Sequence, residues 1–431
     1  MKILVAELSN SKSLADWLDY IQALHSKSIA MGLGRVAQVA TALQLKPPFP
    51  IITVAGTNGK GSTCAMLERI YHEAGYRVGC YTSPHLLRYN ERVRVGCVEA
   101  DDAALCLAFD AVEAARRGVP LTYFEIGTLA AVWHFMHCSL DVVILEVGLG
   151  GRLDAVNVFE PACAIVTGID LDHMDFLGET KELIGFEKAG IYRKNIPAIC
   201  GDAQPPSSLL QYADDIEADL KLIGRDFSCI VTAGGWDFQA YDETIVSLPR
   251  PALVGDFQLN NAACAIQAVD CLQHVLPVSE SEMRCGLQNV TLKGRFQVVS
   301  TSPIVILDVA HNPQATLALA QNLHSEQCSG RTLAVFAMLA DKDVQGVINA
   351  IAVEIDAWYV ADIDHVRGAK AQVLTDFIEQ SAIEKNAFQH HTKNFSSAID
   401  AYKQACIDAN ENDRIVVFGS FFTVTDVMSI I

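Results

Sequence analysis

The sequence predicts an α/β protein of two domains, each built around a mostly parallel sheet. Short, almost continuously apolar runs alternate with helix-length segments along the chain, which is the pattern of parallel strands joined by crossover helices. Strands of this composition are typical of sheets that are covered on both faces. The length of 431 residues exceeds what one hydrophobic core usually serves, so we expect two cores.

The predicted strands form two series. The first comprises residues 51–55, 77–81, 141–147 and 162–169. The second comprises residues 304–310, 332–339, 357–361 and 414–419. Loops and short strands between Gly234 and Pro251 are interpreted as closing the first domain. The predicted organisation is an N-terminal domain over 1–293, a linker over 294–299 and a C-terminal Rossmann-like α/β domain over 300–431.

Bulk composition argues against several classes of protein. Hydrophobic residues make up 51% of the chain, yet no run approaches the roughly 20 apolar residues of a membrane-spanning helix. The N-terminal apolar run is too short for a secretory signal, and the 13 cysteines show no CxxC pair, which is typical of buried thiols in a reducing cytosol. A net charge of -19 repels polyanions. We expect a cytoplasmic protein without membrane or nucleic-acid partners.

A glycine-rich segment is the sharpest single signal. Residues 55–63, AGTNGKGST, follow a predicted strand and open a predicted helix that ends near Gly75. Glycines let backbone N–H groups turn toward phosphate oxygens, the helix N-terminus adds partial positive charge, and Lys60 reaches the terminal phosphates. The match to a Walker loop is imperfect, since Val54 replaces the first glycine and Gly61 is inserted. We predict an N-terminal P-loop ATPase domain; the alternative is a glycine-rich turn without a ligand.

The loop GTNGKGS is similar to that of the Mur ligase superfamily and, with its extra glycine, to the folylpolyglutamate synthase branch. Ten segments in the same order carry the resemblance: residues 25–36, 55–63, 82–95, 122–131, 145–157, 171–178, 187–191, 294–299, 307–313 and 419–424. Among these relatives, the chain most resembles the bacterial bifunctional enzymes that act on both dihydropteroate and folate.

The resemblance implies an ATP-dependent ligase of folate biosynthesis. Such an enzyme adds L-glutamate to dihydropteroate and to reduced folates through an acyl phosphate, because a carboxylate is a poor electrophile until ATP phosphorylates it. The resemblance also implies magnesium, with two ions expected and room for a monovalent cation. We expect a monomer, because one chain supplies all the matching site residues.

Three residues resemble the magnesium ligands of the family. Glu146 ends an apolar strand, His173 follows another strand, and Ser83 lies in TSPH. By themselves they would be a solvated strand end, a structural hydrogen-bonding group and a turn; the resemblance makes them ligands. Lys188 in EKAG would be an ordinary surface lysine near a helix end, but the matching lysine of the family is carbamylated. The implied catalytic residues are Lys60, Lys188, His173 and Arg295.

The resemblance also assigns the substrate contacts. The pterin contacts would be Ser28, Ile29, Ala30, Thr122, Tyr123, Phe124, Glu125, Leu153, Asp154 and Ala155. The ATP contacts would be Thr57, Asn58, Gly59, Lys60, Asn261, Arg295 and Asp308. Phe124 could instead be core packing, and Ala30 replaces an acidic residue of many relatives. Arg295 lies in the linker, where it could act as an arginine-finger-like clamp.

His311 and Ser420 are expected to face the cleft where glutamate enters, and Phe422 replaces a histidine of some relatives.

Other functions are alternatives to the folate ligase. A dinucleotide fingerprint at GLGGRL lacks the third glycine spacing. Folylpolyglutamate synthase activity alone, another Mur-type amide ligase, and a plain P-loop kinase or NTPase remain as alternatives. A noncatalytic folate-binding module does not explain the phosphate loop.

Overall fold

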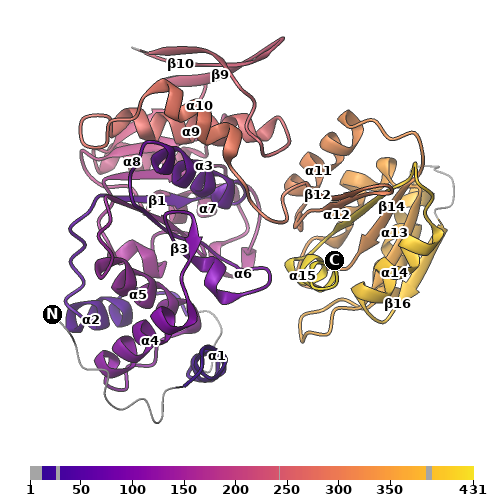
Figure 1. Ribbon diagram of the computed structural model, residues 1–431, viewed down its shortest axis with the longest axis horizontal. Coiled ribbons are helices and arrows are strands. Elements are labelled where there is room, and N and C mark those ends of the chain that lie inside the picture. Colours follow the sequence, from indigo (N-terminus) through magenta and orange to yellow (C-terminus); the bar gives the residue numbers. More distant parts are fainter. Residues whose placement is uncertain (1–11, 26–29, 242, 385–390) are drawn as a thin grey trace.

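The computed structural model describes residues 12–25, 30–241, 243–384 and 391–431. Figure 1 shows two bodies side by side, an N-terminal one and a smaller C-terminal one, joined by the segment that leads into β12 (Gln297–Thr301). This confirms the predicted mixed α/β architecture with parallel-rich sheets.

The N-terminal body contains an eight-stranded sheet in the order β4-β3-β2-β5-β1-β6-β7-β8. The strands are β1 (Ile51–Ala55), β2 (Val78–Tyr81), β3 (Val93–Val95), β4 (Val98–Glu99), β5 (Val142–Glu146), β6 (Cys163–Val166), β7 (Pro197–Cys200) and β8 (Asp219–Leu222). All pair in parallel except the antiparallel edge strands β3 and β4. The carboxyl ends of β1, β5 and β6 therefore meet at one edge.

Helices cover both faces of this sheet. One face packs against α1 (Leu14–Ala23), α2 (Gly34–Ala42), α4 (Asp102–Arg116), α5 (Tyr123–Met136), α7 (Lys181–Ala189) and α8 (Ser207–Asp215). The other packs against α3 (Lys60–Glu73), α9 (Phe257–Cys271) and α10 (Glu280–Asn289). Successive residues of β1 alternate between the two cores: Ile51 faces the first and Ile52 the second. Burial on both faces explains why the strands are almost continuously apolar.

A small antiparallel sheet of β9 (Phe227–Thr232), β10 (Gly235–Ala240) and β11 (Thr244–Leu248) extends from the N-terminal body, at the top of Figure 1. Its inward side chains Trp236 and Phe238 are fully buried in the core beneath α9. This matches the expected short strands around Gly234. Short turns of helix complete the body: η1 (Tyr89–Arg92), η2 (Ala155–Val158) and α6 (Met174–Leu177).

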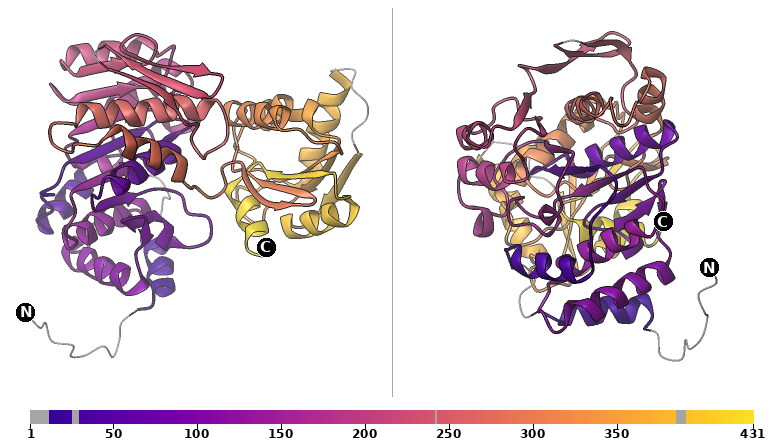
Figure 2. Two further views of the ribbon diagram at one scale, coloured as in Figure 1. Left: turned by 45° about the horizontal axis from the view of Figure 1, so that its top comes forward. Right: turned by 90° about the vertical axis from the view of Figure 1, so that its left-hand side faces the viewer.

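The C-terminal body has a six-stranded sheet in the order β12-β13-β17-β14-β15-β16. Its further strands are β13 (Ile304–Leu307), β14 (Thr332–Phe336), β15 (Ala357–Ala361), β16 (His391–Phe395) and β17 (Arg414–Phe418). Only β12 pairs antiparallel. The helices are α11 (Pro313–Ser325), α12 (Val344–Ile351), η3 (Ala352–Glu354), α13 (Ala371–Glu384), α14 (Ala398–Asp408) and α15 (Phe421–Met428). Figure 2 shows the two sheets with their helices on both sides.

All eight predicted strands are present. The linker predicted over 294–299 overlaps the start of β12 at Gln297. Among the described residues, every helix is too short or too polar to cross a bilayer.

Candidate active site

A cavity of about 1430 Å³ lies between the two bodies and is lined by both. It gathers residues that are far apart in sequence, because the carboxyl ends of β1, β5, β13 and β17 all lead into it. The predicted site residues that line it are Ala30, Thr57, Asn58, Gly59, Lys60, Ser83, Thr122, Tyr123, Phe124, Glu125, Glu146, Leu153, Asp154, Ala155, His173, Lys188, Asn261, Arg295, Asp308, His311 and Ser420. Ser28 and Ile29 lie outside the described residues.

The phosphate loop connects β1 to α3, as predicted. Gly56 and Gly59 both have positive φ, at 152° and 88°. A Cβ at Gly56 would lie 2.0 Å from Thr167 Oγ1, and one at Gly59 would lie 2.4 Å from Asn261 Oδ1. Both positions therefore require glycine. The loop is tied down by a hydrogen bond of 2.6 Å from Thr167 Oγ1 to the carbonyl of Asn58.

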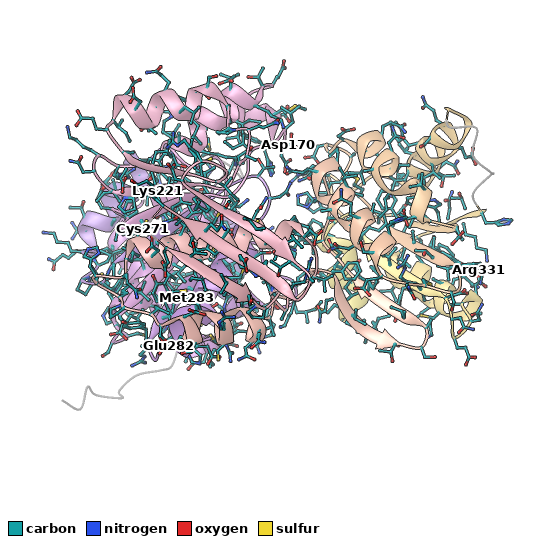
Figure 3. The ribbon with its side chains drawn as sticks, turned by 90° about the horizontal axis from the view of Figure 1, so that it is seen from above. Asp170, Lys221, Cys271, Glu282, Met283 and Arg331 are labelled. Carbon is teal, nitrogen blue, oxygen red and sulfur yellow. The ribbon has the colours of Figure 1, made fainter. Side chains whose placement is uncertain are left out.

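Lys60 begins α3 and turns back over this loop. Its Nζ donates to the carbonyl oxygens of Gly56 at 2.9 Å and Thr57 at 3.2 Å. Thr57 in turn donates through Oγ1 to the carbonyl of Asp170 at 3.0 Å. Figure 3 shows Asp170 on the side of the N-terminal body that faces its neighbour. The loop thus holds an ammonium group, which no described carboxylate pairs with, at the inner edge of the cavity.

Glu146 lies at the carboxyl end of β5 and is buried. Its Oε2 accepts the backbone N–H of Ser83 at 2.9 Å, so two of the predicted metal ligands are adjacent. Burial raises the pKa of Glu146, and the charge of Lys60 and the Ser83 N–H oppose that rise. A cation bound beside Glu146 would stabilise the charged form of this buried carboxylate.

The segment that carries Ser83 is anchored by an ion pair that sequence reasoning missed. Arg94 on β3 pairs with Glu68 of α3 at 2.7 Å. The same guanidinium donates to Thr82 Oγ1 at 3.1 Å and to the carbonyl of Glu91 at 2.8 Å. The pair therefore connects the phosphate-loop helix to the segment of the predicted metal ligand.

His173 occupies the N-cap position of the short helix α6, makes no capping hydrogen bond with its side chain, and is half-buried. Burial, together with the charges of Lys342 and Lys60, lowers its pKa to about 4, against the opposing effect of Asp172. The imidazole is therefore neutral at neutral pH, as a metal ligand must be. Asp172 beside it pairs with Lys342 of the C-terminal body at 2.5 Å and lies 3.8 Å from His311 Nε2.

These donors fit a magnesium site that is completed by phosphate. Ser83, Glu146 and His173 offer a hydroxyl, a carboxylate and an imidazole. No cluster of three or more His, Cys, Asp or Glu side chains with metal-binding geometry occurs among the described residues. Magnesium in nucleotide sites is commonly held by one or two carboxylates together with water and substrate phosphates, so this sparse donor set is compatible with it.

Lys188 lies on α7 with only 3% of its surface exposed, which excludes the surface lysine considered as the alternative. Burial and, to a smaller extent, the nearby charge of Lys60 lower its pKa to about 7, against the opposing effect of Asp172 and Asp154. A substantial fraction of the amine is therefore neutral, and thus nucleophilic, at neutral pH.

Tyr123 and Phe124 line another part of the cavity, which we call the aromatic wall. The ring of Phe124, in the first turn of α5, packs against Gly148, where a Cβ would lie 2.6 Å from the ring. Phe124 is half-buried and lines the cavity, so it is not simply core packing. Asp154 lies nearby, buried, and accepts the N–H groups of Leu149 at 2.9 Å and Val156 at 3.0 Å. Burial raises the pKa of Asp154 to about 7.

Three of the predicted pterin contacts, Thr122, Glu125 and Ala30, have hydrogen-bond partners within the protein. The carboxylate of Glu125 accepts the N–H of Thr122 at 2.7 Å, and the Thr122 hydroxyl accepts the N–H of Glu125, which forms a capping box at the start of α5. Arg35 pairs with Glu125 at 2.8 Å and also donates to the carbonyl of Ala30 at 2.7 Å. These contacts hold the edge of the cavity in place.

The predicted nucleotide contacts converge from three segments. Asn261 in α9 is buried against Gly59 of the loop. Asp308, just after β13, is buried and accepts the N–H groups of Phe296 and Ala310, both at 2.8 Å. Arg295 precedes β12, and its guanidinium lies 5.6 Å from the ring centroid of Phe421.

On the C-terminal side, His311 lies 6.0 Å from the Phe421 ring, and Ser420 caps α15. Phe422 packs against His365 at 5.0 Å. His311 and Ser420 both line the cavity, which is what was expected of cleft-facing residues.

A cluster of amides joins the bodies directly, and sequence reasoning missed its C-terminal half. Asn58 and Asn312 exchange two hydrogen bonds, at 3.2 Å and 3.0 Å. Asn58 also donates to Gln314 at 2.5 Å. Asn312 is the N-cap of α11 and accepts the N–H of Ala315. The phosphate loop is therefore in contact with the first turn of a helix from the other body.

Two family models match the chain and define its class. The Mur ligase middle domain matches residues 54–269, and the Mur ligase glutamate ligase domain matches residues 294–421. The matches include the phosphate loop in the first case and the segment from Arg295 to Phe421 in the second.

Comparison with individual proteins shows to which branch of the Mur ligase family the chain is similar. The chain is 45% identical to the dihydrofolate synthase/folylpolyglutamate synthase of Escherichia coli over 97% of its length and 95% of that protein. It is similar to the structure of E. coli FolC in complex with DHPP and ADP, with a TM-score of 0.91 over 97% and 98% of the two chains at 45% identity. A bifunctional folylpolyglutamate synthase/dihydrofolate synthase with Mn, AMPPNP and L-glutamate bound has a TM-score of 0.89 over 97% and 98% of the chains at 43% identity. The chain therefore belongs to the Mur ligase family, in its branch of dihydrofolate synthase/folylpolyglutamate synthases.

Proposed function

We propose that this chain joins L-glutamate to dihydropteroate, giving dihydrofolate, and to folylglutamates, giving polyglutamates, with ATP as the phosphoryl donor. One observation carries the proposal. A phosphate loop, a buried carboxylate at a strand end and an aromatic wall line a single cavity, which the second body closes with His311 and Ser420.

The residues account for the two steps of the reaction. The acceptor's carboxylate attacks the terminal phosphorus of ATP, ADP leaves, and an acyl phosphate forms. Lys60 and Arg295 supply positive charge beside the transferring group, where charge stabilisation has most effect. The amine of L-glutamate, entering past His311 and Ser420, then attacks the acyl carbon, phosphate leaves and the amine loses a proton. Exclusion of water by the closed cavity protects the acyl phosphate.

Ser83, Glu146 and His173 would hold the divalent metal, which when bound neutralises the phosphates of ATP. We propose magnesium as this metal, with two ions and room for a monovalent cation. A relative binds Mn together with AMPPNP and L-glutamate, which supports a divalent ion beside the nucleotide.

The aromatic wall would hold the pterin ring. Phe124 offers a flat apolar surface, and the Asp154 carboxyl offers oxygen atoms to the N–H groups of the heterocycle. E. coli FolC has been solved with DHPP, which supports a pteridine ligand in this fold. Thr122, Tyr123, Glu125, Leu153 and Ala155, with Ala30, would complete the rim.

We further propose that Lys188 is carbamylated. Its burial disfavours the ammonium form and lowers its pKa to about 7, although Asp172 and Asp154 oppose this. Reaction of the neutral amine with CO2 releases a proton and leaves a carbamate, whose oxygens are suited to magnesium or its water ligands.

We also propose two domain boundaries, an oligomeric state and a cellular compartment. The domain boundaries at 293 and 300 are placed at the segment that connects the two sheets. We propose a monomer, because residues of one chain line the cavity from both bodies. We also propose that the protein is cytoplasmic.

A substrate panel with the purified chain tests the proposed function. Release of ADP is measured with ATP, magnesium and L-glutamate, using dihydropteroate and tetrahydrofolate separately. Turnover of both acceptors is expected. Turnover of tetrahydrofolate alone would reduce the function to folylpolyglutamate synthase activity, and ATP hydrolysis that is independent of acceptor and glutamate would contradict the proposal.

A further inference from the structure

Arg92 at the end of η1 is a buried cation that has no ionic partner among the described residues. The residue is 9% exposed, and it lines the cavity. Its Nε donates to His85 Nδ1 at 2.8 Å, and the guanidinium carbon lies 5.5 Å from the ring centroids of Tyr89 and Tyr123. No carboxylate of the described residues lies within ion-pair distance. Buried charges are normally paired, so this arrangement indicates a missing anion.

Of the other described cations that line the cavity, Lys342 pairs with Asp172 and Arg367 with Asp341. Lys60, Lys188 and Arg295 already have roles in the proposed function. Among these described residues, Arg92 is the lining cation that has neither. Arg92 uses a single N–H for His85, while a guanidinium has five N–H donors in a planar fork that suits a carboxylate.

Arg92 contacts both the segment that carries Ser83 and the start of the helix that carries Phe124. Its carbonyl oxygen accepts the N–H of Thr82 at 2.9 Å, one residue before Ser83 at the phosphate end. Its guanidinium lies against Tyr123, one residue before Phe124 of the aromatic wall. A substrate that extends from Phe124 to the phosphate loop would therefore pass Arg92.

We infer that Arg92, supported by His85, binds the α-carboxylate of the terminal glutamate of folylglutamate acceptors. The inference rests on the proposed function and deepens it. Dihydropteroate has one carboxylate, and that group reacts. A folylglutamate has a second carboxylate, four bonds from the reacting one, and this anion needs a partner in the cavity. Because His85 Nδ1 accepts from Arg92, the proton of the neutral ring is on Nε2, which becomes a second donor. Arg92 would then favour folylglutamates without being needed for the carboxylate that is phosphorylated.

The experiment compares three acceptors on the full chain: tetrahydropteroylglutamate, tetrahydropteroyl-γ-aminobutyrate, which lacks only the α-carboxylate, and dihydropteroate. The wild type is expected to prefer tetrahydropteroylglutamate over the γ-aminobutyrate analogue by about 10- to 100-fold in kcat/KM. Arg92→Gln should reduce this preference to within about threefold, through a loss concentrated on the glutamate acceptor. Arg92→Lys keeps the charge but not the fork, and an intermediate preference is expected.

Arg88→Gln is the matched control, because Arg88 lies in the same segment but is exposed and pairs with Asp102 at 3.2 Å. Arg88→Gln should prefer tetrahydropteroylglutamate over the γ-aminobutyrate analogue by the same factor in kcat/KM as the wild type. An equal loss on all three acceptors in Arg92→Gln would assign Arg92 to the reacting carboxylate or to the fold, and would overturn the inference. So would a wild type that does not distinguish the two tetrahydropteroyl acceptors, a measurement that requires no variant. A wild type that turns over none of the three acceptors would instead refute the proposed function itself.

Discussion

At the scale of single residues, the cleft is characterised by cations whose surroundings differ. Lys60 is held by carbonyl oxygens of its own loop, so its charge is available to an incoming phosphate. Lys188 is enclosed, and its amine is partly neutral. Arg92 faces aromatic rings. These environments suit three different roles, since Lys60 can neutralise phosphate, Lys188 can react with CO2 and Arg92 can bind a carboxylate.

Lys60→Ala should lower kcat by about 100- to 1,000-fold, because it removes a positive charge placed at the transferring phosphate. The variant should keep a cooperative thermal transition close to that of the wild type. Lys181→Ala is the control, since Lys181 is exposed and pairs with Asp170 at 2.9 Å. A near-normal rate in Lys60→Ala would refute the assignment of the loop.

For Lys188, the expected carbamate depends on pH in a definite direction. Only the neutral amine reacts with CO2, and burial lowers the pKa to about 7. The carbamate signal in carbon-13 NMR with labelled bicarbonate should therefore increase as pH rises from about 6 to about 8, and it should be absent in Lys188→Ala. That variant should also lose activity, whereas Lys188→Glu should regain part of it by restoring a negative charge. A plain ammonium at Lys188 in the active, magnesium-bound enzyme would contradict the prediction.

Residues whose role depends on a partner far along the chain could not be predicted from the sequence. Glu146 has a local signal, a carboxylate that closes an apolar strand, but it is predicted as a ligand only because its segment also resembles the family. Asn312, Lys342 and Arg92 have no such signal, since an isolated polar residue in a loop or at a helix start is common. Their contacts arise from the packing of elements distant in sequence.

At the scale of elements, most strands that are buried on both faces were predictable, whereas the buried strand β7 and the edge strands were not. The predicted β1 and β15 agree with the structure residue for residue. The edge strand β16 has the sequence HTKNF, and β4 has only two residues, so neither has an apolar run to reveal it. Helix α7 has a local start signal, because the side chain of Thr180 accepts the N–H of Leu183.

The contact between the phosphate loop and α11 gives an element-scale prediction. Asn312→Ser retains a side-chain oxygen to cap α11 but is too short to reach Asn58, and Gln314→Ala removes the second acceptor. Together they should lower kcat by about 3- to 10-fold, the size expected for lost hydrogen bonds, while ATP affinity changes less. Gln321→Ala, an exposed position on the same helix, is the control. Loss of ATP affinity without loss of kcat would show that these amides serve ground-state binding.

At the scale of the whole molecule, the reaction requires two bodies to meet over one cavity. Polar contacts bridge them: the amides at Asn58, the pair of Asp172 with Lys342, and the Thr425 hydroxyl, which donates to the carbonyl of Leu86 at 3.0 Å. Interfaces of this polar kind permit relative movement of domains. The structure therefore suits an enzyme that closes to react and opens to release product.

Arg295 connects this closure to the chemistry. It precedes the first strand of the C-terminal body, and its charge is close to Glu146 of one body and Asp308 of the other. Its guanidinium packs on Phe421. A cation in this position contacts the phosphates fully only when the bodies are closed, so it should act on the transition state more than on the bound nucleotide.

Arg295→Ala is therefore expected to lower kcat by about 1,000-fold while changing the Kd for ATP by less than about threefold. The Kd is measured by calorimetry with AMPPNP, and kcat by ADP release at saturating substrates. Arg295→Lys should recover only part of the rate, because an ammonium does not reproduce the planar fork. Arg331→Ala serves as the control, since Figure 3 shows Arg331 at the far side of the C-terminal body, where it pairs with Asp413 at 2.8 Å. Equal losses of affinity and rate in Arg295→Ala would make Arg295 a ground-state binding residue, and closure would then have to deliver its charge to the reaction through another group.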